Sequence, residues 1–416
     1  MTKDIFDVLI VYSDRLATSA GTLKDGASLP FAKGSSSESY NVIYGYFLKI
    51  CQKNMLKVAF TTSSDIIGAG KCQSYWLYEG NSWVKVRKTG YSKLIFDKFS
   101  PTNKKIKNNR RLLFSSKKIK PFNQPYLFDL FFDKQKTYKK LHRFSIPTVI
   151  IKKSTVNSVY RACKTLREII RKHAHKEDFS DEIIMKDRFG AGGINVYKFK
   201  ADQTKKIVES LKKHNKKSFI IQSFIRFDKG FSYKNSPVST EIRLIYLGGK
   251  IIQTYIRMAK LGDFRCNEHQ GATLKYIPKS QVPLSVLLTS NKIAKVLNKQ
   301  LMANSHQFSR KRSKSLFTAP PRRSLNKSSS LYALDFIISN NGNIYLLEGN
   351  TGPGLDWNLS NKENKIEAQK LIRIIVKELV KLSLPSKTIK KESENAVTGT
   401  SVTNEYPISV NEPMPV

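Results

Sequence analysis

Two acidic residues, Asp335 and Glu348, stand inside apolar stretches near the end of the chain. The stretches are LYALDFIIS and NIYLLEGNT, and the dipeptide Asn341-Gly342 lies between them. Asn-Gly between two apolar runs is the strongest short signal for a β-hairpin with a two-residue turn. Counting outward from that turn places the two carboxylates directly opposite each other. Asn350 falls on the same face, because side chains along a strand alternate with a period of two.

These three polar residues have the chemistry of a magnesium site. Like charges opposite each other destabilise a sheet, and burial raises the pKa of a carboxyl group unless a positive charge lies nearby. Carboxylate oxygens with an amide oxygen suit Mg²⁺, which commonly shares its shell with nucleotide phosphates. The same count puts Ile337 and Leu346 on the polar face and these residues on the other: Leu334, Phe336, Ile338, Tyr345 and Leu347. An exposed hairpin with solvated charges is the alternative, but two covered faces favour a hairpin built into a larger sheet.

A glycine-rich turn earlier in the chain has the composition of a flap over phosphates. Gly190, Gly192 and Gly193 lie between the expected strands EIIMK and INVYKFK, so they cap a hairpin and do not open a helix. This position excludes a Rossmann dinucleotide fingerprint. Backbone N–H groups of such a turn can face phosphate, with Lys186 on the preceding strand, although Lys186 also fits a surface charge. GAGKC at 68–72 lacks the spacing and the hydroxyl of a P-loop.

Arginine residues gather in the segments that follow. GDFRCNEHQGA places Arg265, Asn267 and His269 at alternate positions, hence on one face if the segment is extended. Arg243 and Arg257 lie on two neighbouring expected strands. An arginine cluster opposite the carboxylates would suit an Mg²⁺-phosphate complex between them, because guanidinium groups bind phosphate oxygens in pairs. A structural ion-pair network is the alternative for any single arginine, and His269 fits a structural role as well as a catalytic one.

The elements that position these residues predict a mixed α/β chain. Apolar periodicity in the first hundred residues predicts strands at 6–13, 56–62, 75–78, 82–85 and 93–96 and an aromatic helix at 37–54. One helix is expected from 126 to 144. A β-α-β-β-α-β run follows to residue 225, with Ser154 capping its first helix. A second sheet begins at 240, turns at Gly248-Gly249, and continues through a helix at 286–302 to the acidic hairpin and a closing helix at 362–382.

These elements group into two domains and a tail. An N-terminal α/β domain is expected over residues 1–125 and a larger domain over 126–384, with α+β subdomains at 126–225 and 226–384. Residues 385–416 lose all periodicity and are predicted to be a disordered tail. Four scattered cysteines form no CxxC pair, so neither a zinc site nor a disulfide framework is indicated. No secretory signal or long apolar run is present, and a cytoplasmic protein is expected.

The chain is strongly basic, with 73 Lys and Arg against 32 Asp and Glu and a net charge of +41. Segments 102–120 and 304–330 contain no acidic residue. Such blocks are typical of flexible arms that attract nucleic acid or another polyanion. The alternative is a general lysine bias of the source proteome. If 304–330 is functional, it would select an acidic peptide or protein substrate and take no part in the chemistry.

Four segments together resemble ATP-grasp ligases, most closely the RimK-like branch that joins a carboxylate to an amine. They are KDRFGAGGINV, TEIRLIYLGGKII, RMAKLGDFRCNEHQGA and DFIISNNGNIYLLEGNTGPGL, and the resemblance covers roughly residues 134–382. It implies an ATP-grasp fold, in which two α+β subdomains hold ATP and Mg²⁺, or Mn²⁺, between their sheets behind an N-terminal α/β domain.

The resemblance also assigns residues to the nucleotide. It makes Lys134 and Lys186 phosphate contacts and Gly190, Gly192 and Gly193 the flap. The adenine segment contains Ser223 and Phe224, where related proteins often have an acidic residue before the aromatic one. Glu241 matches the residue that reaches the ribose. Arg265, Cys266 and Asn267 match the triphosphate-side segment, and Asp335, Glu348 and Asn350 match the Mg²⁺ ligands.

The implied reaction converts a carboxylate and ATP to an acyl phosphate, which an amine then attacks to give an amide, ADP and phosphate. Arg243 and Arg257 would stabilise the acyl phosphate and the tetrahedral oxyanion. The substrates would be an amino acid and an acidic peptide or protein. The basic insertion and the first hundred residues depart from the family pattern, so substrate identity does not transfer. A kinase that uses the same cleft and a non-catalytic ATP-binding scaffold that binds a polyanion are the alternatives.

Overall fold

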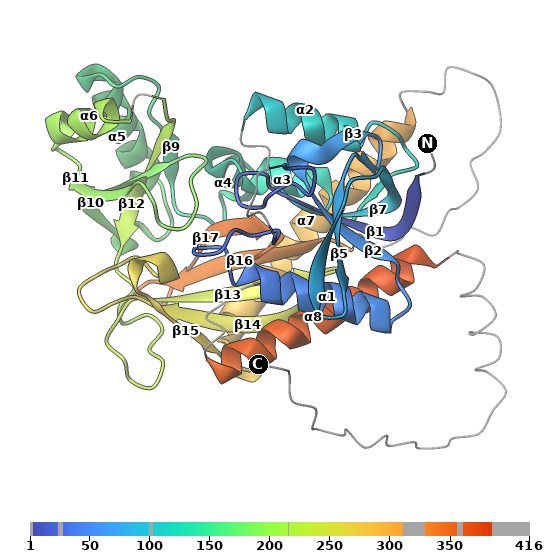
Figure 1. Ribbon diagram of the computed structural model, residues 1–416. Coiled ribbons are helices and arrows are strands. Elements are labelled where there is room, and N and C mark those ends of the chain that lie inside the picture. Colours follow the sequence, from blue (N-terminus) through green and yellow to red (C-terminus); the bar gives the residue numbers. More distant parts are fainter. Residues whose placement is uncertain are drawn as a thin grey trace.

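The computed structural model describes residues 3–23, 28–99, 103–214, 216–310, 329–355 and 361–384. The predicted tail at 385–416 and residues 311–328 of the basic insertion lie outside these ranges. The described residues form three sheets with helices between and around them (Figure 1). The mixed α/β and α+β character expected from the sequence is confirmed.

The N-terminal sheet has a parallel centre with antiparallel edges, in the order β3-β4-β7-β1-β2-β5-β6, and β8 pairs with β7. Its strands are β1 (Asp4–Tyr12), β2 (Val58–Thr62), β3 (Ile66–Gly68), β4 (Lys71–Cys72), β5 (Tyr75–Glu79), β6 (Ser82–Val86), β7 (Gly90–Lys98) and β8 (Lys120–Pro121). The continuous apolar run of β1 is typical of a parallel strand that is covered on both faces. Helix α1 (Tyr40–Lys53) packs on this sheet, and η1 (Ser63–Asp65) follows β2.

Two expectations for this region need correction. The β5–β6 hairpin turns at Gly80-Asn81 and pairs Glu79 with Ser82, so its loop has two residues where three were expected. The basic segment 102–120 is not a flexible arm, since α2 (Lys104–Leu113) occupies much of it. Helix α2 buries Ile106 and Leu113 against the sheet, and this apolar stripe holds the helix in place.

The second sheet is the predicted β-α-β-β-α-β unit, in the order β11-β10-β12-β9. Its elements are β9 (Thr148–Ile150), α5 (Val156–Arg171), η2 (Lys176–Asp178), β10 (Phe179–Asp187), β11 (Val196–Lys200), α6 (Thr204–Lys212) and β12 (Phe219–Ile225). Helices α5 and α6 cover one face of this sheet (Figure 1). Thr155, and not Ser154, caps α5, because its side chain accepts a hydrogen bond from the Ser158 N–H group. The open face of the sheet points toward the third sheet.

The third sheet has the order β15-β14-β13-β16-β17. Its strands are β13 (Thr240–Leu247), β14 (Lys250–Met258), β15 (Thr273–Tyr276), β16 (Leu331–Ile338) and β17 (Ile344–Thr351), with short helices η3 (Glu268–Gln270) and η4 (Lys279–Gln281) between them. The helices are α7 (Leu284–Arg310) and α8 (Lys362–Ser383). Gly248-Gly249 forms the predicted turn, since Leu247 pairs with Lys250.

Alternation along β13 explains why this sheet has one apolar and one largely polar face. Ile242 and Leu244 enter the core beneath α3 and α7. Glu241 and Arg243 point to the opposite face, although both are almost fully buried. Farther along the same face, Ile245 joins a core that is shared with α1, α8 and the N-terminal sheet.

The acidic hairpin exists, and its turn differs from the prediction. Ser339, and not Asn340, pairs with Asn343, because the Ser339 N–H group donates to the Asn343 carbonyl at 2.8 Å. The turn therefore holds three residues and ends at Gly342, whose φ is +84°. A β-bulge between Asp335 and Phe336 then shifts the register by one residue. As a result Asp335 still lies opposite Glu348, as predicted.

The bulge also changes which side chains share a face. Leu346 packs with Leu334 in the core under α7, whereas the prediction placed it with the carboxylates. Tyr345 and Leu347 lie beside Ile337 between the second and third sheets, whereas the prediction placed them on the opposite face. Asp335 is completely buried, which excludes the alternative of a solvated hairpin.

The helix expected from 126 to 144 is broken into α3 (Pro125–Phe131) and α4 (Lys134–Leu141). Asp133 causes the break, because its carboxylate accepts hydrogen bonds from the Gln135 and Lys136 N–H groups and so caps α4. Both helices pack against the third sheet. Within the described residues, no helix is long and apolar enough to cross a membrane.

Candidate active site

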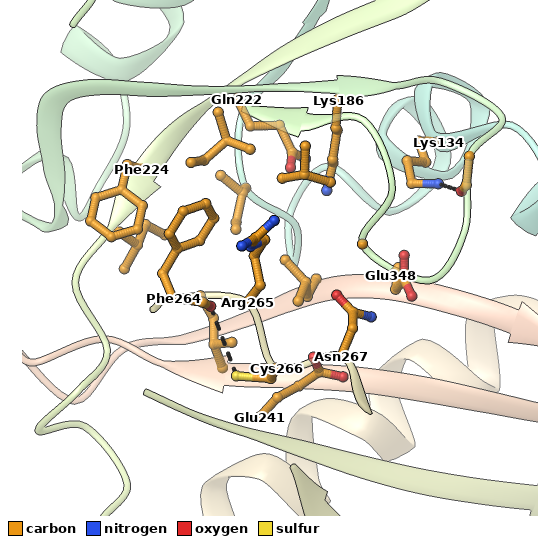
Figure 2. Close-up of a pocket in the computed structure, with 18 of the residues that line it drawn as sticks. Lys134, Lys186, Gln222, Phe224, Glu241, Phe264, Arg265, Cys266, Asn267 and Glu348 are labelled. Carbon is orange, nitrogen blue, oxygen red and sulfur yellow. Dashed lines mark hydrogen bonds between the residues drawn. The ribbon is translucent and has the colours of Figure 1, made fainter. Parts of the chain in front are cut away.

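A cleft with an empty volume of about 840 Å³ lies between the second and third sheets. The eleven residues predicted to bind nucleotide all line it: Lys134, Lys186, Gly190, Gly192, Gly193, Ser223, Phe224, Glu241, Arg265, Cys266 and Asn267. Figure 2 shows Phe224 and Phe264 at one end and Lys134, Lys186 and Glu348 at the other. The cleft therefore has an aromatic end and a charged end, as a nucleoside triphosphate requires.

Lys186 projects from β10 into the charged end of the cleft (Figure 2). Its residue is only 7% exposed. Burial and the nearby Lys134 lower the pKa of Lys186 to about 8, against the opposing effect of Glu348 and Glu241. Lys134 comes from the first turn of α4, and its ammonium group donates to the Gly190 carbonyl. Two lysines thus face the same end of the cleft with few acidic neighbours.

The predicted glycine flap connects β10 to β11 over this end. Among the hydrogen bonds of the described chain, none is donated by the N–H groups of Ala191, Gly192 and Gly193. Gly192 and Gly193 have φ values of +68° and +72°, which favour glycine. A Cβ atom on Gly193 would lie 2.6 Å from the Asn267 Oδ1 atom, so the flap touches the opposite wall. Successive free N–H groups in such a turn are suited to phosphate oxygens.

The other end of the cleft is aromatic. The rings of Phe224 and Phe264 meet edge to face with centroids 5.6 Å apart, and Lys198 lies over the Phe224 ring. Ser223, at the position where related proteins often carry an acid, is buried and donates to the Ser180 carbonyl at 3.3 Å. The prediction did not include Phe264, although it directly precedes Arg265 in the quoted motif.

The carboxylates and arginines of the third sheet form one buried ion-pair network. Arg243 donates to both Asp335 oxygens at 2.5 Å, from its Nε and Nη2 atoms. Arg257 contacts Asp335 at 3.2 Å and also pairs with Glu241. The prediction placed arginines opposite the carboxylates with a ligand between them. They instead lie side by side on adjacent strands, as the structural alternative requires.

The two arginines differ in how many of their guanidinium donors already have a partner. Each of the three guanidinium nitrogens of Arg243 donates within the protein, because Nη1 reaches the Tyr255 hydroxyl at 3.0 Å. In Arg257 the buried Nε atom has no hydrogen-bond partner among the described residues. A buried donor without a partner is costly. Arg257 therefore keeps a donor that Arg243 lacks, although neither arginine lines the cleft or the cavity beside it.

Glu348 is the accessible member of the carboxylate group. It lines the nucleotide cleft and also a neighbouring cavity that Asn350 lines too. Burial alone would raise the pKa of Glu348, but Lys134, Lys186, Arg243 and Arg257 together outweigh burial and lower the pKa to about 2. Glu348 is therefore ionised at neutral pH and faces the charged end of the cleft.

The donors at this place fit a hard divalent cation. The Asn350 amide donates to Asp335 at 3.1 Å and to Glu348 at 3.2 Å, so the three side chains are adjacent. Among the described residues, Asp335 Oδ1 accepts one hydrogen bond, from Arg243 Nε, and it keeps a lone pair. Among the described residues, no group of three His, Cys, Asp or Glu side chains could hold a metal. A cation here would thus rely on the amide and on phosphate oxygens, which is the ligand set that Mg²⁺ uses.

The segment after β14 is not extended, so the condition for the shared face is not met. Arg265 folds back on Asp263, with its Nη2 atom 2.8 Å from Asp263 Oδ2. His269 lies in η3, and so the alternation of Arg265, Asn267 and His269 on one face does not hold. Burial raises the pKa of the Cys266 thiol, which contacts the Ser239 carbonyl at 3.3 Å. Cys266 is therefore a packing residue of the cleft and no thiolate nucleophile.

An ion pair that the sequence analysis missed anchors the flap. Arg188 donates from Nε and Nη2 to the two oxygens of Asp133, both at 2.6 Å. The neighbouring rings of Phe132 and Phe189 stack with centroids 5.2 Å apart. We call these two contacts the flap anchor. Only the tertiary structure brings the residues together, because 55 positions separate Asp133 from Arg188.

Comparison with known proteins agrees with this geometry. Residues 132–296 match the family model of the RimK-like ATP-grasp domain. The chain therefore contains a RimK-like ATP-grasp domain. The match includes both lysines and the flap, and the acidic hairpin lies beyond it. No curated protein sequence matches the chain.

Solved structures share the fold of this chain at low sequence identity. VanG D-Ala:D-Ser ligase from Enterococcus faecalis is 11% identical with a TM-score of 0.52, and the alignment covers 91% of this chain and 100% of VanG. D-cycloserine synthetase DcsG is 12% identical with a TM-score of 0.51, covering 90% of this chain and 99% of DcsG. The predicted ATP-grasp fold is thereby confirmed across most of the chain.

Proposed function

We propose that this ATP-grasp ligase activates a carboxylate as an acyl phosphate and joins it to an amine. A carboxylate oxygen attacks the γ-phosphorus of ATP, and ADP leaves. The amine nitrogen then attacks the acyl carbon and loses a proton, and phosphate leaves with the former carboxylate oxygen. The observation that carries the proposal is Glu348, ionised between two lysines at the junction of two cavities.

The proposed nucleotide contacts follow the two ends of the cleft. Adenine would stack near Phe224, with Phe264 beside it, and Glu241 would reach the ribose. Lys134 and Lys186 would bind phosphate oxygens under the flap, and Arg265 would leave Asp263 to join them. Lys134 now donates to the Gly190 carbonyl, so nucleotide binding would exchange that contact for a phosphate.

Asp335, Glu348 and Asn350 would hold Mg²⁺, or Mn²⁺ with similar ligand preferences. The bound cation would supply charge neutralisation at the transferring phosphoryl group. Arg257 would donate from its free Nε atom to the acyl phosphate or to the oxyanion that forms at the acyl carbon, and Arg243 would keep Asp335 in place. No side-chain nucleophile is required.

We also propose the domain boundaries given above: 1–125, 126–225 and 226–384, with a tail at 385–416. The three sheets support these units, while the core shared by α1, α8 and the third sheet ties the first unit to the last. The carboxylate and amine substrates would include an amino acid, and the basic segments would give an acidic peptide, a protein or another polyanion a second contact.

The test is ADP formation with pools of amino acids, peptides and acidic polymers, with product masses read by mass spectrometry. The proposal predicts ADP and free phosphate only when both a carboxylate and an amine are supplied, together with a product lighter by one water than their sum. A phosphorylated product without free phosphate would identify a kinase instead. ATP binding without turnover in any pool would identify a non-catalytic scaffold.

A further inference from the structure

A second cavity adjoins the nucleotide cleft, with an empty volume of about 1270 Å³. The two cavities share Lys134, Gly190 and Glu348, so they meet at the end of the cleft assigned to the phosphates. The second cavity extends from this junction to the loop after β1, where Arg15 lines it. A substrate in this cavity would therefore have one end at the reacting phosphoryl group and the other at the N-terminal sheet.

One wall of this cavity is aromatic. Phe128, Phe131 and Phe132 from α3 and its end face Phe189 and Ile194 from the flap region. Phe189 is 39% exposed and Ile194 is 61% exposed. The Phe131 ring covers the β17 backbone so closely that a Cβ atom on Gly349 would lie 2.2 Å from it. An apolar wall therefore begins beside Glu348, and an apolar ligand would bury it.

Of the three cationic side chains that line this cavity, one has no partner among the described residues and could pair with a ligand. Lys217 pairs with Asp187 at 3.5 Å, and Lys134 donates to the flap. In the described part of the chain, the Arg15 guanidinium group has no hydrogen-bond or ion-pair partner. It lies just beyond the carboxyl end of β1, the edge at which open parallel sheets bind ligands.

The loop that carries Arg15 is held in place. The Asp14 N–H group donates to the Ser63 hydroxyl at 3.0 Å, and that hydroxyl donates to the Asp14 carboxylate at 2.9 Å. A free guanidinium group on a fixed loop is suited to pair with a carboxylate.

We propose that this cavity binds an amino acid with an aromatic or branched aliphatic side chain as the amine substrate. Its carboxylate pairs with Arg15, its side chain packs against the phenylalanines, and its amine points to the junction at Glu348. The inference rests on the proposed ligase function, because only that function requires an amine at the junction. Acidic side chains are disfavoured by the aromatic wall and by the pairing of Lys217 with Asp187.

Calorimetric binding to the full chain, with Mg²⁺ and a non-hydrolysable ATP analogue present, tests the carboxylate contact. The ligands are the two enantiomers of phenylalanine, phenylalaninamide and glutamate. We expect one enantiomer of phenylalanine to bind at least about tenfold more tightly than its amide and than glutamate. A tenfold difference is the scale of one charge-assisted ion pair. Arg15→Gln should weaken the binding of phenylalanine by about tenfold and leave the affinity for the amide unchanged. Lys33→Gln, an exposed charge in the same N-terminal region, is the matched control and should change neither.

The apolar wall is tested separately by selectivity between phenylalanine and alanine. Phe189→Ser should reduce this selectivity by about tenfold, whereas Tyr160→Ser, at a 53% exposed site on α5, should leave it unchanged. Equal binding of acid and amide to the unaltered protein, or preference for glutamate, would overturn the inference. If the protein forms amides from small or acidic amines, and Arg15→Gln leaves that activity unchanged, the inference is wrong and the ligase function stands. Phenylalanine binding as described, without ADP formation from any carboxylate, would keep the binding site and refute the ligase function.

Discussion

Glu348 links the chemistry of both cavities at the scale of single residues. Its neighbour Asp335 is paired with the arginines of the third sheet, and Asn350 donates to Asp335. Of these three residues, Glu348 alone lines both cavities. The pKa of Glu348 is lowered by Lys134 of α4 and Lys186 of the second sheet, together with Arg243 and Arg257. A carboxylate that faces such cations is suited to share a divalent ion with a phosphate.

Glu348→Ala is expected to reduce ATP turnover by at least about a hundredfold, the scale of losing one preorganised electrostatic group. The fold should persist, because Glu348 lies on an edge strand and at the cleft surface. Steady-state ADP formation and a thermal unfolding curve are the measurements. Glu177→Ala, at an exposed site in η2, is the control. Full turnover in the Glu348 variant would remove the metal assignment.

The pKa of Lys186 predicts how nucleotide affinity depends on pH. Its pKa in the free protein is about 8, so the ammonium form dominates below this pH and is lost as the pH rises. The Kd for Mg²⁺-ADP should be flat near neutral pH and then rise by up to about tenfold per pH unit above the pKa. Lys186→Arg keeps its charge, so its Kd should not change with pH over this range. Lys186→Met should bind Mg²⁺-ADP weakly at every pH. An unaltered protein with a flat profile to about pH 9.5 would place the phosphates elsewhere.

At the scale of elements, the flap and the α3–α4 break act together. The Lys134 N–H group donates to the Arg188 carbonyl at 3.2 Å, next to the two contacts of the flap anchor. The side chain that caps α4 therefore also binds the residue at the start of the flap. A break in the helix and the position of the flap are consequences of the same carboxylate, Asp133.

Breaking the flap anchor should weaken nucleotide binding without removing a nucleotide contact. Asp133→Asn and Arg188→Gln are each expected to raise KM for ATP by about tenfold, since a bidentate charged pair positions the flap. The double variant should be no worse than either single variant, because both changes remove one interaction. Lys370→Gln, which breaks an exposed pair on α8, is the control. Additive losses would mean that the two residues act separately.

The element scale also shows what the sequence can and cannot predict. Local patterns predicted the strands that carry the site, the succession of strands and helices in the second sheet and the pairing of Asp335 with Glu348. They failed where one residue decides between two local outcomes: Asp133 ends a helix that apolar spacing would continue. The hairpin register was right at the carboxylates because a three-residue turn and a bulge offset each other. Neither feature has a signal in the pattern of alternation.

Side-chain contacts between neighbouring strands lay beyond sequence reasoning. The ion pairs of Arg243 and Arg257 with carboxylates on adjacent strands depend on strand order, which the arginine spacing does not encode. The residues that the family resemblance assigned to the nucleotide all line one cleft, and their contacts with a nucleotide stay a prediction. Phe264 and Arg15 were missed, because an aromatic residue in a motif and a lone arginine in a loop are common in structural roles.

At the scale of the whole molecule, the N-terminal sheet is attached to the strand that carries the acidic residues. Lys98, at the end of β7, donates to the carbonyls of Gly352 and Pro353 at 2.6 and 2.7 Å. Asn123 accepts a hydrogen bond from the Leu331 N–H group at 2.8 Å. These contacts keep the loop of Arg15 beside β17, and so the first sheet contributes to the second cavity.

The excess positive charge is also a property of the whole molecule. Helix α2 exposes four cations without an acid: Lys104, Lys105, Lys107 and Arg111. Changing all four to Gln should lower the salt concentration at which the protein leaves a heparin column, because each charge contributes to polyanion binding. The control changes four exposed lysines of the α6 region: Lys205, Lys206, Lys212 and Lys213. Equal shifts for both variants would favour a general lysine bias over a polyanion site at α2.

The most direct test of the proposed chemistry follows oxygen from the carboxylate substrate into phosphate. The carboxylate is labelled with oxygen-18 on both oxygens, and the reaction runs with ATP, Mg²⁺ and the amine that supports ADP formation. An acyl-phosphate ligase must release phosphate that carries one labelled oxygen for each amide formed, because phosphate leaves with a carboxylate oxygen. The account predicts this single label, read by mass spectrometry of the phosphate. Amide formation with unlabelled phosphate would contradict it.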